Sequence, residues 1–120
     1  MFRTLTLLLL IAALGLMIGA TPQKKGGKKA AQPQAATVKV SNFKFEPPVL
    51  RVKAGTTVTW TVEGGNHTVI SDGSTFTSQK LVPGQSFSHQ FTQAGKYPYY
   101  CSFHGDKGGK EMSGTIIVTP

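Results

Sequence analysis

The 120 residues are enough for one ordinary domain, and 13 Lys and Arg against 5 Asp and Glu give a formal net charge of +8. Most of the excess lies in residues 1–36, because residues 37–120 hold eight basic and five acidic side chains and are near +3. No helical pattern dense in Lys or Arg is present to follow a phosphate backbone, so nucleic-acid binding is not expected.

Residues 1–20 have the pattern of a secretory signal. Arg3 precedes an almost unbroken apolar run that ends in Gly19 and Ala20. The run is shorter than the roughly 20 residues that span a bilayer comfortably, which favours a cleaved signal. Ile18 stands where a small residue is preferred, so an uncleaved membrane anchor is the alternative. Either way we expect an exported protein, in a periplasm, a thylakoid lumen or the cell exterior.

Residues 21–36 are expected to be a flexible linker. They read TPQKKGGKKAAQPQAA, with four Lys, two Pro, two Gly and no large apolar side chain that would bury a core. The Lys cluster is interpreted first as a solvated tether. Attraction to an anionic membrane or an acidic partner is the second interpretation.

From residue 37 to residue 120 the sequence predicts a domain made of short strands. Large apolar residues alternate with polar ones in the segments 38–40, 43–45, 57–62, 87–91, 97–101 and 115–119. Turn signals rich in Gly, Pro, Asn and Asp separate these segments, and no helical period is present, so an all-β sandwich or barrel is expected. Trp60 shares one face of its strand with Val58 and Val62, which places it in the core.

The chain has one cysteine, Cys101, and therefore no disulfide within itself. A lone thiol in an oxidising compartment needs an explanation. It is either a buried small apolar residue or a thiolate bound to a metal.

The segment 100–112 carries the pattern of a metal site. Cys101 and His104 lie three residues apart at the end of an aromatic strand, and their thiolate and imidazole suit copper or zinc. Met112 closes the same Gly-rich loop, and a thioether is a weak axial ligand of copper but a poor ligand of zinc. His67 follows a Gly-rich loop after the Trp60 strand, whereas His89 lies on an apolar strand face and is interpreted as a packed residue. Two His, one Cys and one distant Met are typical of a blue-copper electron-transfer site.

With these residues in view, residues 37–120 resemble a cupredoxin of the plastocyanin and pseudoazurin type. The motifs that carry the resemblance are AGTTVTW at 54–60, NHTV at 66–69, VPGQ at 82–85, GKYPYYC at 95–101 and MSGTIIV at 112–118. The resemblance implies a Greek-key β-sandwich with one copper ion near one end. It also implies that His67, Cys101 and His104 are the equatorial ligands and that Met112 is the axial one.

The resemblance further implies that electrons leave through His104, inside an exposed apolar patch, with Tyr100 as a second exit. Two features depart from the family pattern. Thr68 follows the first ligand where plastocyanins usually have Asn, and seven residues rather than four separate His104 from Met112. The longer loop puts the axial bond in doubt, because Glu111 or a backbone oxygen competes for that position.

Three functions are compatible with these residues. The first is a carrier of single electrons between exported or membrane-bound redox partners, expected to be a monomer that takes one copper ion. The second is a copper-binding protein for storage or delivery, and the third is an adhesive sandwich with a vestigial site. The full ligand set argues against the third, and the few His and Met residues argue against the second. A thiol hydrolase is not expected, because Cys101 and His104 share one short loop without an orienting third residue, and zinc would leave Met112 unused.

Overall fold

The computed structural model describes residues 34–120, so the predicted signal and residues 21–33 of the predicted linker lie outside the described residues. Within this part the chain forms eight strands and no helix. They are β1 (Ala35–Ser41), β2 (Lys44–Glu46), β3 (Val49–Lys53), β4 (Thr56–Val62), β5 (Ile70–Ser71), β6 (Ser86–Phe91), β7 (Gly95–Asp106) and β8 (Lys110–Thr119). The first strand begins two residues before the expected start of the domain.

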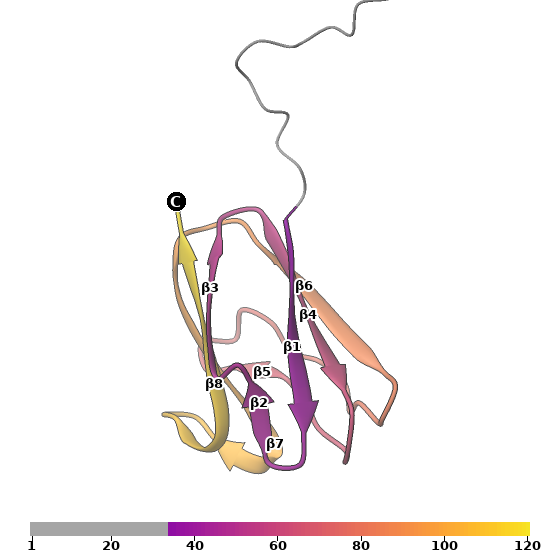
Figure 1. The fold of residues 1–120 in the computed structure, drawn as a ribbon. Coiled ribbons are helices and arrows are strands. Elements are labelled where there is room, and N and C mark those ends of the chain that lie inside the picture. The colour runs from indigo at the N-terminus through magenta and orange to yellow at the C-terminus, as the bar shows by residue number, and fades with distance from the viewer. Residues whose placement is uncertain (1–33) are drawn as a thin grey trace, which may run out of the picture. The chain divides into compact units, whose positions relative to one another are not determined.

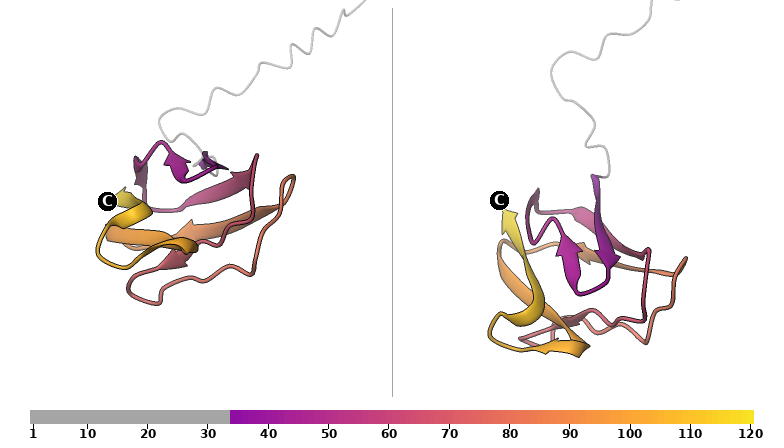
Figure 2. Two further views of the ribbon diagram at one scale, coloured as in Figure 1. Left: turned by 90° about the horizontal axis from the view of Figure 1, so that it is seen from below. Right: turned by 60° about the horizontal axis from the view of Figure 1, so that its bottom comes forward.

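The strands form two four-stranded sheets that face each other (Figures 1 and 2). One sheet has the order β2-β1-β4-β6 and the other has the order β3-β8-β7-β5. Most neighbours are antiparallel, but β1 pairs with β4 and β3 pairs with β8 in parallel. The structure therefore confirms the expected all-β sandwich. No helix that could cross a membrane is found in residues 34–120.

The alternation that predicts the strands also builds the core. Along β4 every second residue is buried, and Val58, Trp60 and Val62 point inward while the threonines between them stay half-buried. The side chain of Trp60 is 0% exposed, as its place in the pattern predicts. Such a period-two pattern buries one face of each strand and leaves the other to solvent.

The prediction of a strand at residues 43–45 was wrong at Phe43, which is a turn residue and not part of a strand. Ser41 pairs with Lys44, so Asn42 and Phe43 form a two-residue turn between β1 and β2. Only Phe43, the second of these two residues, has a positive φ, which is the position that type II turns usually give to Gly or Asn. Phe43 has a φ of 65° and is 68% exposed.

Figure 1 shows which end of the sandwich carries the loops of interest. The start of β1 and the C-terminus lie together at one end, at the top of that view. The Asn42–Phe43 turn and the hairpin between β7 and β8 lie at the opposite end. This second end is called the hairpin end below.

His89 is a packed residue, as the sequence predicts, and we expect it to make the metal-free protein sensitive to acid. Its ring lies 5.0 Å from that of Phe76 and 4.7 Å from that of Phe91, and its burial lowers the pKa of its imidazole. The folded protein therefore favours neutral His89, whereas the unfolded chain takes up the proton near pH 6.5. We expect the free energy of unfolding to decrease as the pH falls below about 6.5.

The comparison of His89→Gln with the unchanged protein tests this expectation. Urea unfolding of the metal-free proteins at about pH 7.5 and about pH 5.5 measures the acid-induced loss of stability. The loss should be smaller in His89→Gln, and the part that persists comes from His67, whose pKa is also lowered by burial. Equal losses in the two proteins would contradict this account.

Candidate metal centre

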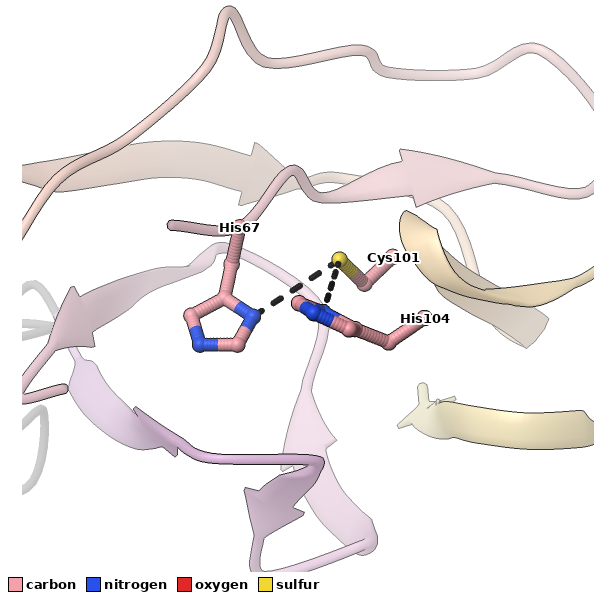
Figure 3. A group of neighbouring side chains, drawn as sticks. All are labelled: His67, Cys101 and His104. Carbon is pink, nitrogen blue, oxygen red and sulfur yellow. Dashed lines mark hydrogen bonds between the residues drawn. The ribbon is translucent and has the colours of Figure 1, made fainter. Parts of the chain in front are cut away.

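Three of the predicted ligands converge at the hairpin end (Figure 3). The Sγ atom of Cys101 lies 3.7 Å from Nδ1 of His67 and 3.6 Å from Nδ1 of His104. All three ligand atoms lie within 4.8 Å of one another. Cys101 and His104 come from β7, where the pairing with β8 is interrupted between Tyr100 and Gly105. This irregularity turns His104 back toward Cys101.

His67 is held by hydrogen bonds on both its backbone and its ring. Its backbone exchanges two hydrogen bonds with Leu81, of 2.9 and 2.7 Å, and the two residues form an isolated antiparallel bridge outside the strands. Its Nε2 atom lies 2.7 Å from the carbonyl oxygen of Gly64. Because a carbonyl oxygen only accepts, Nε2 carries the proton and Nδ1 presents a lone pair toward Cys101.

The protonation of His67 suits a ligand. Its side chain is 0% exposed, and this burial lowers the pKa of its imidazole, with the nearby His104 acting in the same direction. The hydrogen bond to Gly64 opposes the shift without cancelling it. His67 is therefore neutral near pH 7, which is the form that binds metals.

The geometry fits a single ion between the three side chains. Metal–sulfur bonds of about 2.3 Å and metal–nitrogen bonds of about 2.0 Å, at angles near 120°, would place each nitrogen about 3.7 Å from the sulfur. The two observed separations of 3.7 and 3.6 Å match this value. His67, Cys101 and His104 are thus placed to form a copper site.

Thr68 secures the cysteine from the segment that precedes β5. Its backbone N–H donates to Sγ of Cys101 over 3.5 Å. Its hydroxyl accepts a hydrogen bond of 2.8 Å from the N–H of Ser102 and lies 2.9 Å from the Ser102 hydroxyl. Thr68 therefore ties the segment that carries His67 to the segment that carries Cys101, at the position where plastocyanins usually have Asn.

The long loop between His104 and Met112 continues the β7–β8 hairpin. Gly105 pairs with Glu111 and Asp106 pairs with Lys110, so the extra residues extend outward as ordered strands. Met112 is 2% exposed and belongs to the same core cluster as Cys101, whereas Glu111 is exposed. The backbone N–H of Gly108 also donates to Asp72 over 2.9 Å, which fastens the tip of the hairpin.

Gly105 lets the hairpin close against Met112. A Cβ atom at Gly105 would lie 2.6 Å from the backbone oxygen of Met112 and 2.7 Å from that of Lys110. Both contacts are with backbone, so the strands must move apart. We expect Gly105→Ala to lower the free energy of unfolding by about 1–3 kcal/mol, as overpacking does elsewhere. Urea unfolding of the metal-free protein measures this loss.

Gly73→Ala is the matched control for Gly105→Ala, because a Cβ at Gly73 meets nothing within 4 Å. Its free energy of unfolding should stay within about 0.5 kcal/mol of the unchanged protein. If Gly105→Ala is as stable as Gly73→Ala, the close hairpin described here is incorrect.

Several residues that shape the centre were not predicted from the sequence. The contact of the Gly64 carbonyl with His67 could not be predicted, because every residue has a backbone carbonyl and the sequence does not show which one binds. Gly65 could have been found from its neighbours Gly64 and Asn66, since such a turn signal beside a ligand indicates close packing. Phe43 was misplaced in a strand, yet its ring lies 4.9 Å from that of His104.

The fold and the centre define the class of the protein, a small β-sandwich built to hold one metal ion between two imidazoles and a thiolate. The family described as "Cupredoxin-like domain" matches residues 7–118. The chain therefore belongs to the cupredoxin-like family.

Individual relatives agree with this assignment. Plastocyanin of Scenedesmus fuscus is 36% identical over 86 residues, which cover 62% of this chain and 85% of that protein. Amicyanin of Paracoccus denitrificans is 34% identical over 82 residues, which cover 63% of each chain. Among solved structures, a purple cupredoxin from Nitrosopumilus maritimus is 31% identical with a TM-score of 0.60, over 70% of this chain and 99% of that one.

Proposed function

We propose that this chain is a blue copper protein that carries single electrons between exported or membrane-bound redox partners. His67, Cys101 and His104 would hold the copper ion, with Met112 as a weaker fourth ligand. The observation that carries the proposal is the convergence of two imidazole nitrogens and one thiol sulfur within 4.8 Å. Bound copper supplies a one-electron couple between Cu(I) and Cu(II).

The chain's own residues keep the site from rearranging when the charge changes. Thr68 donates a hydrogen bond to Sγ of Cys101, and Gly64 fixes the ring of His67. Both contacts come from the connection between β4 and β5, which is anchored by the two backbone hydrogen bonds between His67 and Leu81. Such outer contacts orient the ligands and tune the properties of the metal. A rigid site of this kind favours fast electron transfer.

Electrons are proposed to leave through His104. Cys101 and His67 are buried, whereas His104 is half-buried at the hairpin end. Phe103 beside it is 53% exposed, and with Phe43 it gives this end an apolar surface on which a redox partner docks. Half-buried Tyr100, next to Cys101 in β7, is a second exit.

We also propose that the protein is exported and that it is not an enzyme. Residues 1–20, outside the described residues, would direct export or tether the monomer to a membrane. Cys101 is 0% exposed and faces two imidazoles, so its thiol is not presented to a substrate. This environment suits a metal ligand better than a nucleophile.

Redox cycling of the copper-loaded protein tests the proposal. The protein is loaded with Cu(II), reduced with ascorbate and reoxidised with ferricyanide over several cycles, and bound copper is measured after desalting. A carrier should regain its visible spectrum and retain its copper in every cycle. Loss of the ion on reduction would instead indicate a protein for storage or delivery.

A further inference from the structure

The backbone of Phe43 is strained, and burial of its side chain does not compensate for this strain. Its φ of 65° lies in the left-handed region, which side chains with a Cβ rarely adopt and which glycine adopts freely. Its large apolar side chain is 68% exposed, so it gains little from burial. A strained backbone that is retained at such a site points to a function.

The ring of Phe43 makes a specific contact with His104. The two ring centroids lie 4.9 Å apart at an interplanar angle of 84°, an edge-to-face arrangement that aromatic rings prefer. Phe103, the other exposed ring near His104, is farther away at 6.3 Å.

His104 needs such support more than His67 does. The ring of His67 is fixed through its Nε2 by the Gly64 carbonyl. Within residues 34–120, the one hydrogen-bond contact of the His104 ring is that of Nδ1 with Cys101. The rest of the half-buried ring is therefore held by packing.

The same turn also abuts the loop that holds His67. A Cβ at Gly65 would lie 2.6 Å from Oδ1 of Asn42, the residue before Phe43. The Asn42–Phe43 turn therefore contacts both segments that carry the histidine ligands.

We propose that Phe43 is a positioning residue for His104. Its ring holds the His104 imidazole in the orientation that faces Cys101, with or without a metal ion. The strained conformation of the Asn42–Phe43 turn places an aromatic ring beside the imidazole of His104. The inference rests on the proposed function only in taking His104 as a copper ligand.

The rate of Cu(I) loss to excess bicinchoninate measures how firmly His104 is held. His104 is the least buried of the three ligands, and it must detach for copper to leave. Phe43→Gly and Phe43→Leu should lose Cu(I) about threefold to tenfold faster, the factor that an aromatic pair contributes. Phe43→Tyr keeps the ring and should stay within about twofold of the unchanged protein. Unchanged loss rates in Phe43→Gly and Phe43→Leu would overturn the proposal.

Two further measurements separate positioning from a general effect on folding. Ser74 also has a positive φ, of 64°, so Ser74→Gly relieves a similar strain and should leave the loss rate unchanged. Phe43→Gly should melt no lower than the unchanged protein, because glycine relieves the turn. A lower melting temperature in Phe43→Gly would make Phe43 a structural residue and overturn the proposal.

NMR spectra of the metal-free protein give a readout that does not depend on copper. In Phe43→Leu the ring signals of His104 should shift and broaden, while those of His67 stay in place. Unchanged His104 signals would overturn the inference about Phe43. Failure to bind copper, with the His104 signals shifted as expected, would overturn the proposed function alone.

Discussion

Replacing Trp60 by alanine is expected to lower the free energy of unfolding by about 3–5 kcal/mol, the usual cost of removing a buried aromatic side chain. Trp60 is 0% exposed in β4, and its ring lies 5.3 Å from that of Tyr99 in the opposite sheet. The rings of Phe76 and Phe91 pack against it at 5.5 and 6.3 Å. Because small domains are stable by only about 5–15 kcal/mol, this one change should remove a large fraction of the stability of the protein.

Thr61→Ala is the matched control for Trp60→Ala. Thr61 is the next residue of β4 and points to the outer face, where its hydroxyl lies 3.2 Å from that of Ser86. Denaturant unfolding of the metal-free proteins should show a loss below about 1.5 kcal/mol for Thr61→Ala. If the two variants lose equal stability, Trp60 is not the centre of the core.

Gly65→Ala should weaken copper binding by about tenfold to a hundredfold, as the loss of contacts that orient a ligand does in other metal sites. Gly65 has a φ of 78°, and a Cβ there would lie 2.7 Å from Nε2 of His67. A Cβ there would also lie 2.6 Å from Oδ1 of Asn42. The methyl group should therefore displace both the Asn42 side chain and the His67 ring, and the movement of the ring weakens its contact with the Gly64 carbonyl. Competition with a chelator for Cu(II) measures the change in affinity.

Gly84→Ala controls for the backbone cost of Gly65→Ala. Gly84 also has a positive φ, of 90°, but a Cβ there meets nothing within 4 Å. Both variants should lose stability, by about 1–2 kcal/mol for the left-handed backbone. Only Gly65→Ala should lose copper affinity, and an equal loss in Gly84→Ala would show that strain rather than the His67 contact is responsible.

Much of the fold could be predicted because burial imposes a period of two on each strand. The alternation in 57–62 identified β4 and placed Trp60 in the core, and both are confirmed. The convergence of Cys101 with His104 follows from their short separation in sequence. His67 lies far away along the chain and was placed through its loop position and the family resemblance.

The remaining features depend on contacts that residue types do not encode. Phe43 looked like a strand residue because its neighbour Phe45 shares its apolar character, yet the tight pairing of β1 with β2 makes it a turn. The Gly-rich loop before Met112 looked like a loosening insertion, but cross-strand pairing makes it part of a hairpin. The ring of His67 is fixed by a backbone carbonyl, which any residue at position 64 would supply.

The most direct test of the central claim is a titration of the protein with Cu(II), followed by visible absorption spectroscopy beside Cys101→Ser. The account predicts an intense blue thiolate-to-copper band that saturates at one copper ion per chain and bleaches reversibly on reduction. The band should be absent from Cys101→Ser. A colourless or faintly coloured complex of the unchanged protein would mean that the Cys101 thiolate does not bind Cu(II), and it would contradict the proposed electron carrier.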